Sequence, residues 1–398
     1  MEIQEQYLMY QLAYKLVNEE QYEMLHINPK SNEVWLEKQS RQSSKLIRIV
    51  QRGFDWKNHL KKDIASVFKR VKLMNKHFIG KEIDVSNIYV TEHEPVDSWN
   101  ELKQPMVMKD KKPIKMNVFY ITNENRYDEE KRLLKQLDVG VVLDEDFPSE
   151  IVQKTTVQQY KHILVNFLNE KNNQIKRTFS YGKARITFLL ILINLVIFFM
   201  LELNGGSTNI ETLVKYGAKY NPAIIAGEWW RIISSMFLHI GALHLFMNML
   251  AIYYLGTAVE RIYGSTRFVI IYFISGIIGG LTSFAFNTHI AAGASGALFG
   301  LFGALLYFGV IHKQLFYQTM GKSVIFILLI NLAFGFLVPQ IDMGAHVGGL
   351  IGGFIAAAIA SLPYQKHSVT LHRMLGVISF LIIIIFLVRY GVTMHDVS

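Results

Sequence analysis

The chain contains no cysteine, and this absence removes whole classes of chemistry. Disulfides, zinc–thiolate sites and cysteine-protease mechanisms all need a thiol, so they are excluded. Charged residues are also scarce, because only 18% of the 398 residues are charged while 51% are hydrophobic. That balance is too apolar for an ordinary soluble protein of this length, and it indicates a membrane-embedded part.

A secretory signal is also missing, since residues 1–6 offer neither a basic region nor an apolar stretch. We therefore expect the polar first half to stay in the cytosol. The net charge of +9 would suit a nucleic-acid-binding protein, but no such motif is present. Lys and Arg residues beside membrane spans explain the basicity without one, so we expect no nucleic-acid partner.

Residues 1–180 alternate helical and strand patterns, which predicts a soluble α/β domain. Apolar residues at helical spacing predict helices within 7–16 and 60–71, and a long polar helix over 150–176 would lead to the membrane as a stalk. Short β-type runs between turn residues predict strands at 46–50, 88–90, 118–121 and 139–143. No catalytic constellation is found in this domain, and a cytosolic partner for it is left open.

Long apolar runs begin at residue 186, and each is about 15 to 20 residues long, enough to cross a bilayer. They cover 186–201, 239–256, 268–286, 295–311, 324–338, 345–362 and 375–390. These runs predict a polytopic α-helical membrane protein with seven spans. None of the eight prolines falls inside them, and Pro222, Pro339 and Pro363 are placed in connecting loops.

The distribution of basic residues predicts the orientation of the chain in the membrane. Basic residues crowd the start of the first span and recur in the connections between spans 2 and 3, 4 and 5, and 6 and 7. They are Lys171, Lys176, Arg177, Lys183, Arg185, Arg261, Arg267, Lys313, Lys322, Lys366 and Arg373. We expect a multi-pass protein of the plasma membrane with its amino terminus in the cytosol and its carboxy terminus outside.

The few strongly polar residues of the spans gather at one level, and such residues are costly in a bilayer and mark functional candidates. Crossing parity places the beginnings of spans two, four and six at the outer face. Ser295 opens span four and His346 opens span six. His244 and Asn248, four residues apart, share one face of span two at that same end.

The chemistry suited to this set is acyl transfer. A serine hydroxyl is a poor nucleophile until an imidazole takes its proton, which His346 could do for Ser295. The backbone N–H of Ser295 at a helix amino terminus, with the side chains of His244 and Asn248, could stabilise the oxyanion. No metal or cofactor is required.

The neighbours of the serine suit the same reading. Gly293 and Gly296 are small enough for a substrate backbone to approach closely. Phe299, one turn beyond Ser295, could pack against the imidazole of His346.

Each residue also has a purely structural interpretation. A lone membrane serine is usually a packing residue, and the GxxxG pairs Gly296/Gly300 and Gly349/Gly353 would bring spans four and six together in any case. A lone intramembrane histidine more often serves structure or an ion path. Catalysis is favoured because packing alone does not require a nucleophile, a base and two donors at one level.

The set resembles the rhomboid family of polytopic proteases, which cut transmembrane substrates. The motifs that carry the resemblance are Gly293-Ala294-Ser295-Gly296, the stretch from Ala345-His346 to Gly352-Gly353, and His239, His244 and Asn248 in HxxxxHxxxN spacing. Trp230-Arg231 in the first outer loop and Glu260 after the second span are similar to further family elements.

The resemblance implies an intramembrane serine endopeptidase with a six-helix catalytic bundle, a Ser-His dyad and a water-filled site reached laterally. Asp342 is interpreted as a solvated loop residue rather than a triad acid. His239 is assigned to shaping the outer loop, and Trp230 with Arg231 to anchoring it at the interface. Transmembrane proteins are the implied substrates and the lipid bilayer the implied surroundings.

The soluble domain and the additional span are similar to the long, GluP-type members of that family. The expected domains are 1–180, 181–365 for the six-span catalytic part, and 366–398 for a seventh helix. GluP-type proteins often continue into a tetratricopeptide region, whereas this sequence stops at Ser398.

Other classes fit less well. A zinc metalloprotease would need HExxH, and an aspartyl type would need two intramembrane aspartates, neither of which is present in the sequence. A transporter whose path is lined by His239, His244 and His346 is the main alternative, but no second symmetric half is found. A non-proteolytic rhomboid-like scaffold is the other, although such proteins usually lack the serine or the histidine.

Overall fold

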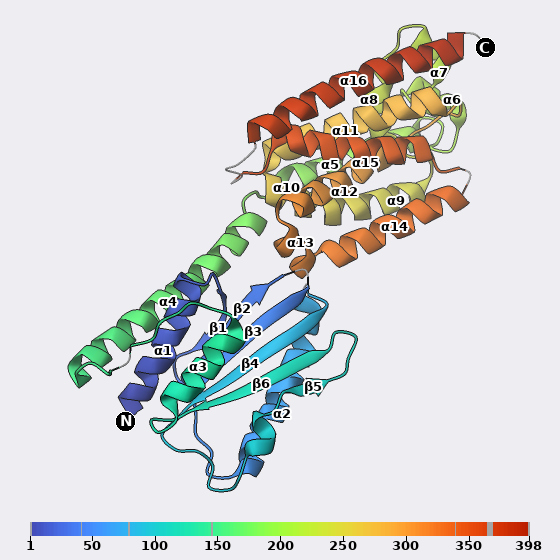
Figure 1. The fold of residues 1–398 in the computed structure, drawn as a ribbon. Helices are drawn as coiled ribbons and strands as arrows, with labels where there is room; N and C mark the ends of the chain where they lie inside the picture. Colours follow the sequence, from blue (N-terminus) through green and yellow to red (C-terminus); the bar gives the residue numbers. More distant parts are fainter. Residues whose placement is uncertain are drawn as a thin grey trace. The chain divides into compact units, whose positions relative to one another are not determined.

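The computed structural model describes residues 2–40, 42–78, 80–144, 146–338, 340–363 and 369–396. It divides into two compact units, Met1–Gln174 and Ile175–Ser398. Figure 1 shows a sheet with covering helices in the first unit and a bundle of helices in the second. The expected division at 180 and 365 stays a prediction, and the second of these boundaries, with Lys366, lies outside the described residues.

The first unit is built on a six-stranded mixed sheet with the strand order β1-β2-β3-β4-β6-β5. The central strands β3, β4 and β6 are parallel, while β1, β2 and β5 are joined to their neighbours in antiparallel fashion. The bounds are β1 (Glu23–Asn28), β2 (Glu33–Gln39), β3 (Ser43–Gln51), β4 (Glu82–Val90), β5 (Met106–Met108) and β6 (Ile114–Ile121). The parallel strands are buried along most of their length, polar residues such as Arg48 and Asn87 included, because helices cover both faces of the sheet.

Two hydrophobic clusters fill the two sides of this sheet. Helices α1 (Glu2–Asn18), α3 (Arg126–Leu137) and the first half of α4 (Glu150–Phe179) pack on one face. Helix α2 (Lys57–Met74) packs on the other, as Figure 1 shows. Two short 3₁₀ turns, η1 (Asn75–His77) and η2 (Asn100–Lys103), lie in the connections. The unit is therefore a three-layer α/β structure.

Most of the elements predicted for this unit are confirmed. The helices expected within 7–16, 60–71 and 150–176 are α1, α2 and α4, and the runs 46–50, 88–90 and 118–121 lie in β3, β4 and β6. The first half of α4 is not a free stalk, however, because Gln153, Val157 and Leu164 are buried. The strands β1, β2 and β5 were not predicted.

The strand predicted at 139–143 is wrong. This segment is a loop whose Val141 and Leu143 side chains enter the core while its polar backbone groups are bound by side chains of other elements. Gly140 N donates to Glu20 Oε1 over 3.0 Å, and Lys15 Nζ donates to the carbonyl of Val142. Alternating burial thus arises here without a neighbouring strand, and periodicity alone does not distinguish the two cases.

The second unit consists of helices that are mostly apolar. They are α5 (Arg185–Leu203), α9 (Ala242–Ala251), η4 (Ile252–Gly256, a π-helical turn), α10 (Thr257–Tyr263), α11 (Ser265–Phe286), α12 (Ser295–Ile311), α13 (Lys313–Thr319), α14 (Gly321–Leu337), α15 (Met343–Ala360) and α16 (Val369–Asp396). The connection from α5 to α9 contains α6 (Ile210–Lys215), α7 (Asn221–Ile225), α8 (Arg231–Ser234) and the 3₁₀ turn η3 (Ser235–Phe237).

In the described part of the chain, five helices are long and apolar enough to cross a membrane: Arg185–Leu203, Ala242–Tyr263, Ser265–Phe286, Met343–Ala360 and Val369–His395. Helices α13 and α14 form a further apolar pair bent by 75°, and α12 is a shorter apolar helix. The protein is therefore a multi-pass membrane protein. All seven predicted runs fall on helices, while the number of crossings stays a prediction.

Two details of the predicted membrane part need correction. The run 239–256 begins too early and ends too soon, because Gly241 adopts φ 78° before the helix and the π turn continues the span to Tyr263. Pro222 lies within the short helix α7 rather than in a loop, at its start where proline is tolerated. Pro363 follows α15 as expected, and Pro339 lies outside the described residues.

Helices α12 and α15 touch through glycine. A Cβ atom added to Gly349 would lie 1.9 Å from the carbonyl oxygen of Gly296, and one added to Gly353 would lie 1.9 Å from that of Gly300. Contact this close needs residues without side chains. The GxxxG pairs therefore do bring these two helices together, and Figure 1 shows α11 beside them.

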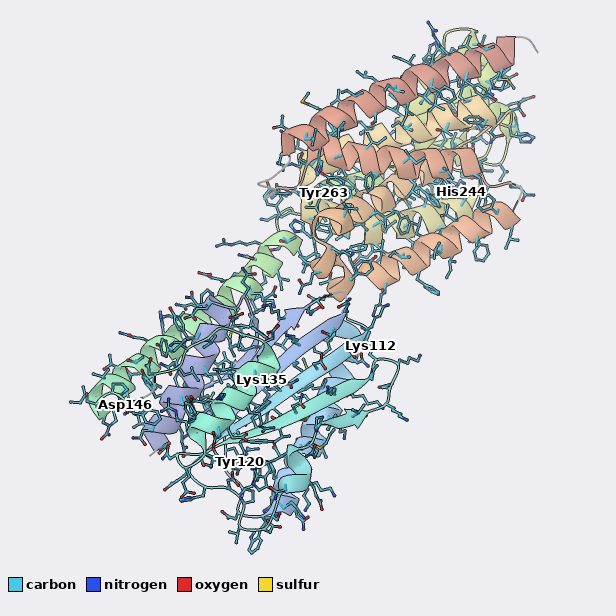
Figure 2. All side chains as sticks on the ribbon, viewed as in Figure 1. Lys112, Tyr120, Lys135, Asp146, His244 and Tyr263 are labelled. Carbon is cyan, nitrogen blue, oxygen red and sulfur yellow. The ribbon has the colours of Figure 1, made fainter. Side chains whose placement is uncertain are left out.

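The fully buried carboxylate of Glu260 joins α10 to the start of α5. It accepts hydrogen bonds from the backbone N–H groups of Arg185, Ile186 and Thr187 over 3.1, 3.0 and 2.8 Å. The hydroxyls of Thr187 and Ser265 complete its shell over 2.7 and 2.6 Å. The first span is thus capped from a neighbouring helix, which satisfies backbone donors that an apolar sequence cannot satisfy itself. Figure 2 places the nearby Tyr263 and the candidate residue His244 at opposite ends of this unit.

Candidate active site

Ser295 is the first residue of α12 and is partly exposed. The turn before it is held by Gly293, whose N–H donates to the carbonyl of Ser235 over 2.9 Å. Backbone N–H groups in the first turn of a helix have no partner within that helix. The serine hydroxyl thus lies beside free donors and the positive end of a helix dipole.

His346 lies in the first turn of α15 and is only 8% exposed. Its ring stacks on that of Phe299, with ring centroids 4.0 Å apart and planes inclined by 16°. Phe299 lies one helical turn beyond Ser295, on the same face of α12. The predicted packing of Phe299 against this imidazole is therefore confirmed.

The backbones next to the two residues are also in contact. A Cβ atom added to Gly296 would lie 3.4 Å from the carbonyl oxygen and 3.8 Å from the Cβ of Ala345. Ser295 and His346, each one residue from this contact, are thus at the same level on adjoining helices. In the described residues no hydrogen bond joins the Ser295 hydroxyl to His346. Catalytic hydrogen bonds are often long before substrate binds and tighten in the complex.

His244 and Asn248 approach the turn before Ser295 from α9. A Cβ atom added to Gly293 would lie 2.8 Å from Cε1 and 2.9 Å from Nε2 of His244, and 3.9 Å from Nδ2 of Asn248. Gly293 also adopts φ 144°, so this position excludes a side chain on both grounds. Asn248 donates to the carbonyl of His244 over 3.0 Å, which leaves the second hydrogen of its amide for another acceptor.

His239 lies before α9 and is fully buried. Its ring packs edge-on against that of His244, with centroids 5.4 Å apart and planes inclined by 64°. The ring of His239 thus contacts the ring of His244 from within the protein, and its role in shaping the outer loop stays a prediction.

Arg231 holds the connection between α5 and α9 together from within. Only 7% exposed, it donates to the carbonyls of Val214 and Ala218 over 2.6 and 3.3 Å and pairs with Glu228 over 2.6 Å. The half-exposed Trp230 stacks beneath it, with the guanidinium 4.9 Å from a ring centroid. The arrangement suits the structural role expected of the pair.

The interpretation of Asp342 as a solvated loop residue is wrong. Its carboxylate caps α15 by accepting from the N–H of Ala345 over 2.9 Å, and it also accepts from Asn287 Nδ2 over 2.8 Å and from the Ser283 hydroxyl. Asp342 therefore ties α11 and the following loop to the helix that carries His346. Aspartate is a common residue at the position before a helix, where its carboxylate accepts from the backbone N–H three residues later. The sequence around Asp342 carries this signal, and the prediction missed it.

Replacing Asp342 with asparagine separates this capping role from a triad acid. Asparagine caps a helix about as well as aspartate, but its amide nitrogen cannot accept from Asn287 as Oδ2 does, so we expect Asp342→Asn to retain any proteolytic rate of the wild type only within about tenfold. A triad acid would lose about 10⁴-fold in kcat with the same change. Asp342→Ala, which removes the cap, should lower stability by about 1 kcal/mol. Cleavage rates and thermal unfolding of the purified variants measure both effects.

The comparisons with known proteins cover the whole site. Residues 226–363 match the family model of the rhomboid domain, a range that holds every candidate residue described above. Rhomboid protease GluP of Bacillus subtilis (strain 168) is 36% identical over 364 residues, which is 91% of this chain and 70% of that protein. An alignment of that length also includes much of the first unit.

Two further relatives match over a smaller part of this chain. Putative rhomboid protease YdcA of Bacillus subtilis (strain 168) is 35% identical over 150 residues, covering 37% of this chain and 75% of that protein. RHOMBOID-like protein 6, mitochondrial, of Arabidopsis thaliana is 42% identical over 160 residues, covering 39% of this chain and 52% of that protein.

Proposed function

Because the chain belongs to the rhomboid family, we propose that it is an intramembrane serine endopeptidase that hydrolyses peptide bonds in or near transmembrane segments of membrane proteins. Relatives named as rhomboid proteases support the protease class. The serine mechanism is supported chiefly by one observation, the stacking of His346 on Phe299 one turn from Ser295.

The proposed reaction begins when the Ser295 hydroxyl attacks the substrate carbonyl carbon while the imidazole of His346 takes the hydroxyl proton. The tetrahedral intermediate collapses when the imidazolium gives that proton to the leaving amine, which leaves an ester on Ser295. Water then attacks the ester with His346 again as base, and the carboxyl product departs as the serine regains its proton. In the net reaction, one peptide bond and one water molecule are converted into a carboxylic acid and an amine.

The oxyanion formed in both steps would be stabilised from two elements. The N–H of Ser295 comes from the amino end of α12, and the side chains of His244 and Asn248 come from α9. Donors held in place before reaction stabilise developing charge without reorganisation, and this is usually a large part of catalysis. Gly293 and Gly296 leave space for an extended substrate backbone beside the serine.

Lateral access from the bilayer is part of the proposal. Helix α14 is packed loosely, since only Gly321, Val324, Leu328 and Gly335 are buried along it, whereas most of α12 is buried. A helix held by few contacts moves at lower cost than a core helix.

We further propose seven crossings with residues 1–180 in the cytosol of a plasma-membrane protein, the site near the outer face and the carboxy terminus outside. The basic residues of the connections support this orientation.

Cleavage by the purified full-length protein tests the proposal. The protein is incorporated into liposomes with a single-span substrate, and the products are identified by mass spectrometry. New termini in or beside the transmembrane segment would support proteolysis. Failure of folded protein to cut any of a panel of single-span helices would favour the transporter or scaffold alternatives.

Removal of one oxyanion donor should have an intermediate effect. We expect Asn248→Ala to lower kcat by about 10²- to 10³-fold with little change in KM, because the donor acts on the transition state. Met247→Ala, an exposed neighbour on the same helix, should leave kcat within about twofold. Steady-state cleavage rates against substrate density in liposomes separate the two constants, and an equal loss in both variants would contradict the assignment.

A further inference from the structure

The segment 287–294 joins α11 to α12 and delivers Ser295, yet it has little regular structure of its own. It is paired instead with the connection between α6 and α7. Lys219 N donates to the Ala291 carbonyl over 2.9 Å, and Ala291 N donates to the Lys219 carbonyl over 3.1 Å. The position of the serine therefore depends on what holds this segment.

The side chain of Lys219 adds two stronger ties to the same segment. It is 1% exposed, and its ammonium group donates to the carbonyls of Asn287 and His289 over 2.6 and 2.8 Å. A lysine is almost never fully buried unless it is paired. Here the partners are carbonyl oxygens, and the described residues hold no ion pair of Lys219. Packing alone does not require a charge in this place, since an apolar side chain would fill the space at lower cost.

The carbonyl that Lys219 binds belongs to a residue that also reaches α15. Asn287 donates through Nδ2 to Asp342, the cap of the helix that carries His346, over 2.8 Å. Asn221, two residues beyond Lys219, donates to the same Asn287 carbonyl over 3.1 Å. One cluster of hydrogen bonds thus fixes the loop that precedes Ser295 and the helix that carries His346.

We propose that Lys219 is a positioning residue of the active site, whose ammonium group fixes segment 287–294 so that Ser295 and its backbone N–H are held toward His346. The inference rests on the proposed function for the reaction that is served. The anchoring of segment 287–294 by the buried ammonium group does not depend on what reaction the site carries out.

The ammonium form of Lys219 is the one that binds both carbonyls. Burial lowers its pKa to about 8, against the opposing effect of the Asp342 carboxylate. Among the described residues, charged or titratable groups near it also include His289 in the segment itself, Arg231, which binds the adjacent Ala218 carbonyl, and His395 of α16, which contacts Asn221. Deprotonation removes a charge-assisted donor, so wild-type cleavage should decline as pH rises through about 8.

Three variants test the proposal. Lys219→Met fills the space without donors and should lower kcat by about 10- to 100-fold with KM little changed, since small misplacements of reacting groups have effects of that size. Lys219→Arg keeps a charged donor at all these pH values and should recover much of the rate and retain it above pH 8. Lys215→Met, an exposed lysine of α6, is the matched control and should behave as the wild type.

Hydrogen exchange supplies a readout that does not depend on proteolysis. Lys219→Met should speed amide exchange in peptides covering 287–294 while other helices of the unit stay protected. Unchanged exchange there, an unchanged kcat, or an alkaline decline that persists in Lys219→Arg would each overturn the role of Lys219 and leave the proposed function intact. If Lys219→Met exchanges faster in this loop but the wild type cleaves no substrate, the role of Lys219 as a loop anchor would be supported and the protease proposal refuted.

Discussion

The Ser295→Ala variant is expected to lose cleavage of a single-span substrate entirely, by a factor on the order of 10⁶ in kcat. The hydroxyl is the atom that forms the ester, and no other side chain of the described site can replace it. The hydroxyl makes no hydrogen bond in the described part of the structure, so its removal should leave folding and insertion unchanged. Initial cleavage rates in liposomes at matched protein density measure the loss.

The control for this variant is another serine of the same unit. Ser275 on α11 is buried and donates to the Tyr272 carbonyl over 3.0 Å, which is the usual role of serine in a membrane helix. Ser275→Ala should cleave within several-fold of the wild type. Cleavage by Ser295→Ala at a rate near that of Ser275→Ala would show that the proposed nucleophile is wrong.

The His346→Ala variant should fall nearly as far as Ser295→Ala, because an unassisted serine hydroxyl is a poor nucleophile at neutral pH. The double variant should be no slower than either single one, since residues that act as a unit lose their effect together. His312→Ala, at the other end of α12, is the matched control and should keep most of the activity. Cleavage rates of the wild type, the two single variants and the double variant form a complete double-mutant cycle.

Additive losses in that cycle would contradict the dyad. They would mean that the imidazole contributes without the serine, for example through the shape of the site alone. Loss of His346 also removes the stacking partner of Phe299, so the unfolding temperature of each variant must be compared with the wild type. A rate lost in proportion to folded protein would assign His346 to packing.

That Ser295 and His346 lie at one level on adjoining helices could be predicted from the sequence because it follows from simple rules. Apolar runs mark helices, and crossing parity then brings the first turns of alternate spans to one face. Ser295 and His346 do lie in the first turns of α12 and α15, and the glycine pairs do bring those helices into contact. Both results depend on short-range pattern, which a single sequence carries.

The residues that hold the site together could not be predicted in the same way. Lys219 is bound to a loop far along the chain: its ammonium group donates to the carbonyls of Asn287 and His289, and its backbone N–H donates to that of Ala291. A lysine in a loop is ordinarily solvated, so its sequence gives no sign of these contacts. Glu260 likewise caps α5 from a different helix, so neither partner shows the link in its own sequence. Asp342 was the exception, since a helix cap is a local signal that could have been recognised.

The edge of the sheet in the first unit shows a similar limit. Strands β1 and β2 mix buried and exposed residues without a clean alternation, and a register shift interrupts their pairing near Met24. The loop 139–143 alternates well yet pairs with no strand among the described residues. Pairing is decided by neighbours distant in sequence, which periodicity does not report.

Labelling by a fluorophosphonate tests the central claim most directly, because only an activated serine reacts with such a probe. The purified wild-type protein should acquire one label, located on Ser295 by mass spectrometry of its peptides. His346→Ala should label far more slowly, and Ser295→Ala should not label in this unit at all. A folded wild type that stays unlabelled, or equal labelling after Ser295→Ala, would contradict the account.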